Sequence, residues 1–273
     1  MAQLFTRLLL ATEHSEFDAG AEAMAFALAT RCQLPLATVL PLVSNPEYEA
    51  IAPQIAAKAE QEAAAKIADL RQQAQVVGVS IDLRLRRGQE PYQEIVDEAR
   101  AQGSDVIIIR RRGQRGLLAN LLVGEMVSKV VTHAPCHVLI VPREAQLWQR
   151  RVLVAAEATP TGRQIVSTAL AVAAQCALPL HLVSVVAAEA LRAPVDVFVA
   201  DMLTQARALG LVAQGEVRLG KPFTEILAAR AASQSDLIVM GTRGEPSIGR
   251  ALLGGVAQKV MGLSEHPILV LHS

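Results

Sequence analysis

Four glycines near the C-terminal end of the sequence have the spacing of a phosphate-binding loop. They are Gly241, Gly244, Gly254 and Gly255. Glycine lets the backbone approach an anion closely. The first amides of a helix have no partner within that helix, and they lie at the positive end of its dipole. Thr242 and Arg243 add a hydroxyl and a charge-assisted donor. The segment predicts a phosphate site, with an ordinary turn between a strand and a helix as the alternative.

Motifs of several enzyme classes are missing from the sequence. It contains no G-x-x-x-x-G-K-[ST] loop, no H-E-x-x-H pair and no G-x-S-x-G elbow. No lysine is therefore placed for a γ-phosphate, no zinc site is predicted, and a hydrolase would lack its usual nucleophile turn. We expect a binding site with neither a catalytic centre nor a metal centre.

The composition indicates a large aliphatic core and no broad affinity for nucleic acid. Of the 273 residues, 52% are hydrophobic and only 3% aromatic, and 26 basic side chains balance 26 acidic ones. No apolar run approaches the roughly 20 residues that span a bilayer. The N-terminal residues lack a signal-peptide pattern, and three cysteines form no disulfide framework. We expect a cytoplasmic protein with no nucleic-acid or membrane partner.

The chain contains an internal repeat. Residues 7–43 match residues 151–187 at a constant offset of 144, which aligns Glu13 with Glu157. Later segments match at offsets of 132 to 130, so the first copy has a 12-residue insertion between Val43 and Gly78. The repeat predicts two homologous domains, residues 1–145 and 146–273.

Each copy alternates short apolar runs with amphipathic helical segments. In the first copy, strands are predicted at Leu8–Thr12, Leu36–Leu42, Ser80–Leu85, Val106–Arg110 and His137–Val141. The first helix is predicted to begin at Ser15 in one copy and at Thr159 in the other, because both are good N-caps. The alternation predicts parallel sheets with helices on both faces. Ligands of such sheets bind beyond the carboxyl ends of the strands.

The residues Asp236–Gly244, a gap of nine residues and a further glycine resemble the nucleotide-binding signature of universal stress proteins, G-x2-G-x9-G followed by Ser or Thr. Thr132–Pro142 resembles that family's closing segment. The resemblance covers nearly the whole chain as two domains in tandem. It implies Rossmann-like, adenine nucleotide alpha hydrolase-like domains. Each would be a five-stranded parallel sheet in the order 3-2-1-4-5, with ATP or AMP, with or without magnesium, between strands one and four.

The resemblance also implies roles for residues of the second copy. Gly241, Gly244 and Gly254 match the three glycines of the phosphate loop, and Thr242 and Arg243 lie between the first two. Gly255 stands where the family has Ser or Thr, so one hydroxyl is lost. Glu157 matches the acidic residue near the ribose, and Val185 matches the position whose backbone reads the adenine edge.

The first copy departs further from the signature. Arg110 stands at the position of the first glycine, and Glu125 stands where Ser or Thr is expected. Arg110, Arg111, Arg112 and Arg115 could attract an anion; the alternatives are a solvated basic loop or salt bridges to the partner domain. We expect residues 1–145 to have lost the nucleotide site.

These observations predict a cytoplasmic stress-response protein whose domain at 146–273 binds ATP or AMP. The role is regulatory, with at most slow, incidental ATP hydrolysis, and the ligand acts by shifting conformations toward those that bind a protein partner or form a homodimer. The alternative is an interaction scaffold of the same fold that binds no nucleotide.

Overall fold

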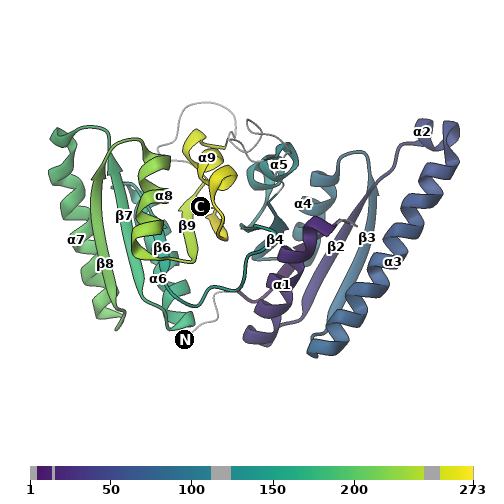
Figure 1. Ribbon diagram of the computed structural model, residues 1–273, viewed down its shortest axis with the longest axis horizontal. Coiled ribbons are helices and arrows are strands. Elements are labelled where there is room, and N and C mark those ends of the chain that lie inside the picture. Colours follow the sequence, from purple (N-terminus) through teal and green to yellow (C-terminus); the bar gives the residue numbers. More distant parts are fainter. Residues whose placement is uncertain (1–4, 14–15, 112–123, 243–252, 273) are drawn as a thin grey trace. The chain divides into compact units, whose positions relative to one another are not determined.

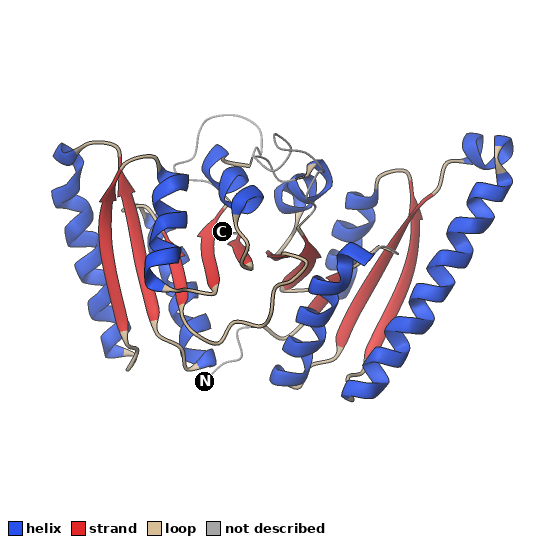
Figure 2. Ribbon diagram, viewed as in Figure 1, coloured by secondary structure: helices blue, strands red, loops and turns tan. Residues whose placement is uncertain are grey.

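The computed structural model describes residues 5–13, 16–111, 124–242 and 253–272 (Figure 1). Its contacts divide the described chain into two compact units. The N-terminal unit holds the described residues up to Leu147, and the C-terminal unit holds those from Trp148 onward. Each unit is a parallel β-sheet with helices packed against it (Figure 2). The predicted fold class is confirmed.

The N-terminal unit alternates strands and helices. Its elements are β1 (Leu8–Ala11), the 3-10 turn η1 (Glu16–Asp18), α1 (Ala19–Cys32), β2 (Leu36–Val43), α2 (Pro46–Ile51), α3 (Pro53–Val77), β3 (Ile81–Gly88), α4 (Pro91–Gln102), β4 (Val106–Arg110), α5 (Glu125–His133) and β5 (His137–Val141). The five strands pair in parallel in the order β3-β2-β1-β4-β5. The order therefore reverses between β1 and β4, where ligands of open parallel sheets bind.

The C-terminal unit repeats this pattern. Its elements are β6 (Val152–Ala155), α6 (Pro160–Cys176), β7 (Leu180–Val186), η3 (Glu189–Leu191), α7 (Arg192–Ala208), β8 (Ala213–Leu219), α8 (Pro222–Ser233), β9 (Leu237–Gly241), α9 (Gly255–Leu263) and β10 (Ile268–Leu271). All pairs are parallel, in the order β8-β7-β6-β9-β10. Counted within each unit, both sheets have the order 3-2-1-4-5.

The first helices of the two units begin differently. Thr159 caps α6 as predicted, because its hydroxyl accepts a hydrogen bond of 3.0 Å from the Gly162 amide, and Pro160 takes the first helical position. Ser15, the predicted start in the other unit, lies outside the described residues; there the 3-10 turn η1 begins at Glu16 and α1 follows at Ala19. Asp18 takes the cap position, but its carboxylate makes no capping bond and pairs instead with Arg110.

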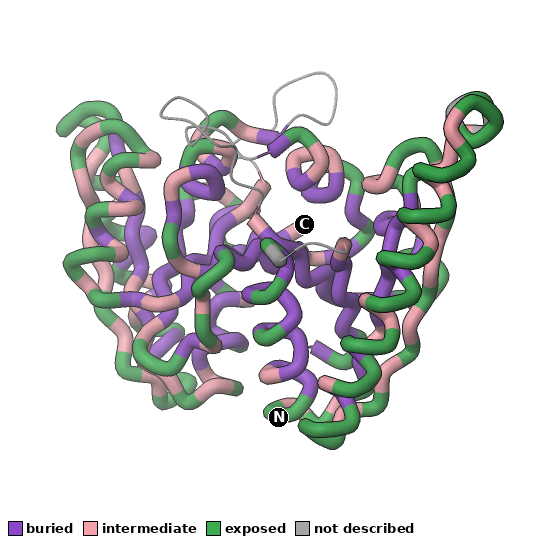
Figure 3. Tube along the Cα trace, turned by 45° about the vertical axis from the view of Figure 1, so that its right-hand side comes forward, coloured by how far each residue is buried: buried purple, intermediate pink, exposed green. Residues whose placement is uncertain are grey.

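The central strands form the core of each unit. Every residue of β1, β4 and β6 is buried, whereas the edge strands β3 and β8 have no buried residue. Figure 3 shows the buried chain gathered in the interior and the exposed chain on the outside. Burial raises the pKa of the Cys136 thiol to about 12, which makes it unreactive. Cys32 and Cys176, at the ends of α1 and α6, are half-buried. Within the described ranges, no helix is both long and apolar enough to cross a membrane.

Candidate functional site

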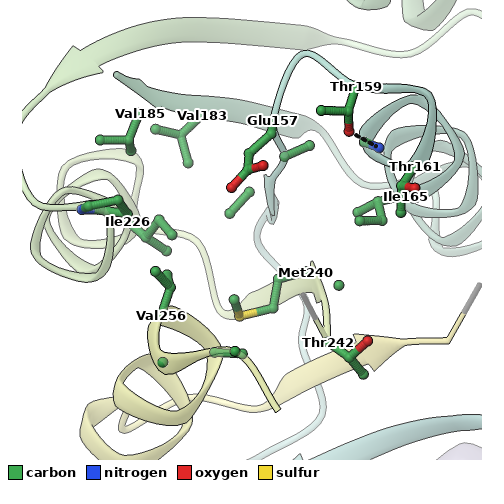
Figure 4. A pocket seen from close by; sticks show the side chains of 18 residues that line it. Glu157, Thr159, Thr161, Ile165, Val183, Val185, Ile226, Met240, Thr242 and Val256 are labelled. Carbon is green, nitrogen blue, oxygen red and sulfur yellow. Dashed lines mark hydrogen bonds between the residues drawn. The ribbon is translucent and has the colours of Figure 1, made fainter. Parts of the chain in front are cut away.

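A cavity of about 250 Å³ opens at the carboxyl edge of the C-terminal sheet (Figure 4). Its walls come from the ends of β6, β7 and β9 and from the first turns of α6, α8 and α9. This is the place where the strand order reverses, between β6 and β9. The cavity therefore lies where the order of a doubly wound sheet predicts a ligand.

Six of the eight predicted site residues line this one cavity. They are Glu157, Val185, Gly241, Thr242, Gly254 and Gly255. The other two, Arg243 and Gly244, lie outside the described residues. The structure thus brings together residues that are almost 100 positions apart in the sequence.

Glu157 is held in place by tight packing of the turn after β6. A Cβ atom on Gly162 would lie 1.9 Å from the carbonyl oxygen of Glu157, so only glycine fits in this turn of α6. The neighbouring Ala156 carbonyl accepts a hydrogen bond of 2.7 Å from the Ser184 hydroxyl of β7. These contacts fix the backbone of Glu157, and Figure 4 shows its carboxylate directed into the cavity.

One side of the cavity is apolar. Val183 and Val185 of β7 lie there together with Ile226 of α8 and Val256 of α9 (Figure 4). From the sequence only Val185 was predicted. Val183 could have been predicted as well, because residues two apart along a strand lie on the same face, and Val183 is two residues before Val185. Such a wall suits a flat, weakly polar ring.

The opposite side carries hydroxyls, and the start of α9 lies below, next to the apolar wall. Thr161 and Thr242 lie there (Figure 4), and sequence analysis had missed Thr161. The amide of Gly254 donates a hydrogen bond of 3.0 Å to the Thr242 carbonyl, so this amide, predicted to face a phosphate, is already engaged. The amides of Gly255 and Val256 begin α9 and have no partner within the helix. Anion binding at this end therefore depends on those two amides.

The described lining of the cavity is poor in ionisable groups. Glu157 is the only ionisable side chain among the described residues that line it. No group of three or more His, Cys, Asp or Glu suited to a metal occurs in the part of the chain that the structure describes. The arrangement combines an apolar wall, one carboxylate and a helix N-terminus, which can bind a ligand but offers no base for proton transfer beyond Glu157.

In the N-terminal unit, the place equivalent to Gly241 is filled by an ion-pair cluster. Arg110 ends β4 at the position that Gly241 has in β9, and it is only 5% exposed. Its guanidinium pairs with the carboxylates of Glu13 and Asp18, the latter at 3.1 Å. Glu13 is the counterpart of Glu157. The side chain that replaces the glycine thus neutralises the carboxylate expected near a ribose.

The remaining arginines of the N-terminal loop have different positions. The Arg111 amide donates a 2.7 Å hydrogen bond to the Val141 carbonyl, while Arg112 and Arg115 lie outside the described residues. Glu125, the counterpart of Gly255, pairs with Lys129 at 3.0 Å. Arg110 thus forms these salt bridges within its own unit, and not to the partner domain as the alternative had it.

Two parallel α/β units, one with a cavity at its strand-order reversal, define a tandem protein of the doubly wound, ligand-binding class. The model of the universal stress protein family matches residues 4–142 and again residues 149–272. The chain belongs to the universal stress protein family, with two such domains in tandem.

Solved structures with this fold cover nearly the whole chain. A universal stress protein of Archaeoglobus fulgidus is 19% identical, with a TM-score of 0.79, over 98% of this chain and 96% of that one. A functionally unknown protein of Pseudomonas aeruginosa PAO1 is also 19% identical, with a TM-score of 0.75, over 97% and 92%. At this identity the likeness shows the fold alone.

A curated relative in sequence is matched over a shorter segment. A Thermus aquaticus universal stress protein, encoded in the 3′ region of a QAH/OAS sulfhydrylase gene, is 42% identical over 52 residues. This segment is 19% of the present chain and 38% of the relative. This likeness supports membership of the universal stress protein family, but the matched segment is too short to carry over an activity or a partner.

Proposed function

We propose that the C-terminal domain binds an adenine nucleotide, ATP or AMP, as a regulatory ligand in a cytoplasmic stress response. The observation that supports this proposal is the division of one cavity into three chemically different parts. An apolar wall at Val185, a carboxylate at Glu157 and a helix N-terminus at Gly255 face the same space. A base, a ribose and a phosphate chain require these three environments in this sequence.

In this proposal the adenine lies against Val183, Val185 and Ile226, where an aromatic ring gains apolar contact. The ribose hydroxyls donate to Glu157. The phosphates lie near Gly241 and Thr242, and the amides of Gly255 and Val256 are directed at them. Arg243 and Gly244 would complete the loop. Magnesium, if bound, would be held mainly by the phosphates and water, since the described lining residues supply one carboxylate.

The nucleotide acts by changing which conformations are populated and not by being consumed. The described lining residues contain no lysine, histidine or cysteine that could serve in phosphoryl transfer. Hydrolysis is expected to be slow and incidental. A ligand that binds one conformation more tightly shifts the population toward it, and this conformation would bind a protein partner or a second copy of the chain.

A scaffold that binds no nucleotide is the second candidate. Two observations favour it: the Gly254 amide is already bonded to Thr242, and Gly255 has no hydroxyl. In the N-terminal domain, proposed to span residues 1–145, Arg110 occupies the corresponding place. These features weaken a phosphate site without filling the C-terminal cavity.

Thermal unfolding with and without nucleotide separates the two candidates. Ligand at 100 times its dissociation constant stabilises the folded state by about 2.7 kcal/mol. Gly241→Arg introduces into the C-terminal domain the residue that pairs with Glu13 in the N-terminal domain, and we expect it to remove the stabilisation. Val197→Arg, at a 70% exposed position of α7, is the matched control. An unchanged melting temperature of the wild type at millimolar ATP and AMP would favour the scaffold.

A further inference from the structure

The N-terminal unit contains a second cavity, of about 530 Å³, which we call the insertion cavity. It lies between the end of β2, the helix α2 and the first turns of α3, with Glu13 and Pro91 at its border. Figure 1 shows α3 running alongside β3, with α2 next to one end of α3. The segment from Val43 to Gly78, which is 12 residues longer than its counterpart, therefore builds most of its walls.

The walls of the insertion cavity are apolar and only partly covered. Val43 is 63% exposed and Ile55 is 67% exposed, and both line the cavity. The α3 residues that face it beside Ile55 are alanines, including Ala56, whose small side chains leave the space open. Adjacent exposed apolar side chains around a hollow of this size are typical of a ligand site.

The polar part of the insertion cavity is acidic. Glu13 and Glu49 line it, and no Lys, Arg or His occurs among the described lining residues. Glu49 accepts a hydrogen bond of 2.7 Å from the neutral hydroxyl of Ser44, which leaves its negative charge uncompensated by that contact. Arg110 neutralises Glu13 but is 5% exposed and not part of the lining. The carboxylate of Glu49 would repel an anion and attract a cation.

We propose that the insertion cavity binds a small apolar molecule that carries one protonated nitrogen. The apolar body lies against Val43, Ile55 and Ala56, and the ammonium group donates to the Glu49 carboxylate. Glu13, Pro41 and Pro91 of this lining are the repeat counterparts of Glu157, Val185 and Pro222, but the site lies in the other unit, so it does not depend on nucleotide binding in the C-terminal cavity. A nucleotide is negatively charged, whereas the insertion cavity would select a positively charged ligand.

Three probes with one apolar body and different head groups test the charge preference. They are 4-phenylbutylamine, 4-phenylbutan-1-ol and 4-phenylbutanoate, each titrated into the full chain and followed by NMR or calorimetry. We expect the amine to bind about fivefold more tightly than the alcohol, as expected for a partly exposed ion pair, and the carboxylate to bind most weakly. Tighter binding of the carboxylate, or binding of none of the three, would overturn the proposal.

Matched variants locate the site. Ala56→Trp fills the cavity and should abolish binding of the amine, while Ala57→Trp, on an exposed neighbour that does not line it, should leave binding unchanged. Glu49→Gln should lower the affinity for the amine to that for the alcohol without changing the fold. Gly255→Trp blocks the C-terminal cavity and should have no effect. Equal losses in the Ala56 and Ala57 variants, or an unchanged amine preference in Glu49→Gln, would contradict the assignment.

Discussion

Replacing Gly255 with serine should strengthen nucleotide binding in the C-terminal domain. Gly255 is the first residue of α9 and is exposed at the mouth of the cavity. A Cβ atom added there meets no heavy atom within 4 Å, so the side chain of serine fits without moving a neighbour. The resemblance to the family motif places a hydroxyl at this position. Gly255→Ser therefore restores a donor for a phosphate oxygen at no steric cost.

The magnitude follows from the kind of bond gained. A hydrogen bond to a charged group contributes about 1.5–3 kcal/mol, and the exposure of Gly255 favours the lower end. This corresponds to an affinity for ATP or AMP about tenfold higher. Gly255→Ala is the control, since it also adds a Cβ atom and raises helix propensity but adds no donor.

Calorimetric titration of the three proteins with ATP and with AMP measures the effect. We expect the serine variant to bind about tenfold more tightly than both the wild type and the alanine variant. If serine and alanine change the affinity equally, the hydroxyl does not reach a phosphate. If neither variant binds nucleotide, the position of the phosphates at α9 is refuted.

Three further predictions concern stability and are checked by chemical unfolding. Arg110→Ala should lower the free energy of unfolding by about 3–5 kcal/mol, because it leaves buried carboxylates unpaired. Arg84→Ala, at a 56% exposed ion pair, should cost less than about 1 kcal/mol, and equal losses would contradict this account. Burial lowers the pKa of His137 and His266 below 6.5, with Arg230 adding to the effect at His266. The unfolded chain then binds more protons, so stability is full above pH 6.5 and falls as the pH drops below it. Substituting both histidines with Gln should flatten that decline, and an unchanged pH dependence would refute the assignment. Asp236→Ala removes the acceptor of three backbone amides at the start of the C-terminal unit and should cost about 1–3 kcal/mol, a loss that an unchanged unfolding midpoint would exclude.

The fold was largely predictable because its signals are local and repeated. The bounds of β4 and β5 are as predicted, since buried parallel strands are short apolar runs. The strand β3 extends past its predicted end at Leu85 to Gly88. The added residues Arg86 and Arg87 are charged, which is typical of a loop. In the structure, Arg86 pairs with carboxylates of α4 and Arg87 pairs with a carboxylate of α3. A strand end that is stabilised by ion pairs from neighbouring helices has no signal in its own segment.

The site was predictable where backbone chemistry decides the residue type. The spacing of the glycines predicted Gly241 and Gly255, and the resemblance to the family predicted Glu157; all three line the cavity. Gly162 and Ile226 were missed, because their roles arise from contacts between separate elements. The ion pairs of Arg110 with Glu13 and Asp18 were also missed. An arginine after a strand reads as a loop charge unless its distant partners are known.

The number of ATP molecules bound per chain tests the central claim most directly. Calorimetry of the full-length protein should give one site per chain, and Gly241→Arg should remove it. Two sites per chain would show that the N-terminal domain still binds nucleotide despite Arg110. A single site that survives Gly241→Arg, or no binding at all, would contradict the proposal that the C-terminal cavity holds the nucleotide.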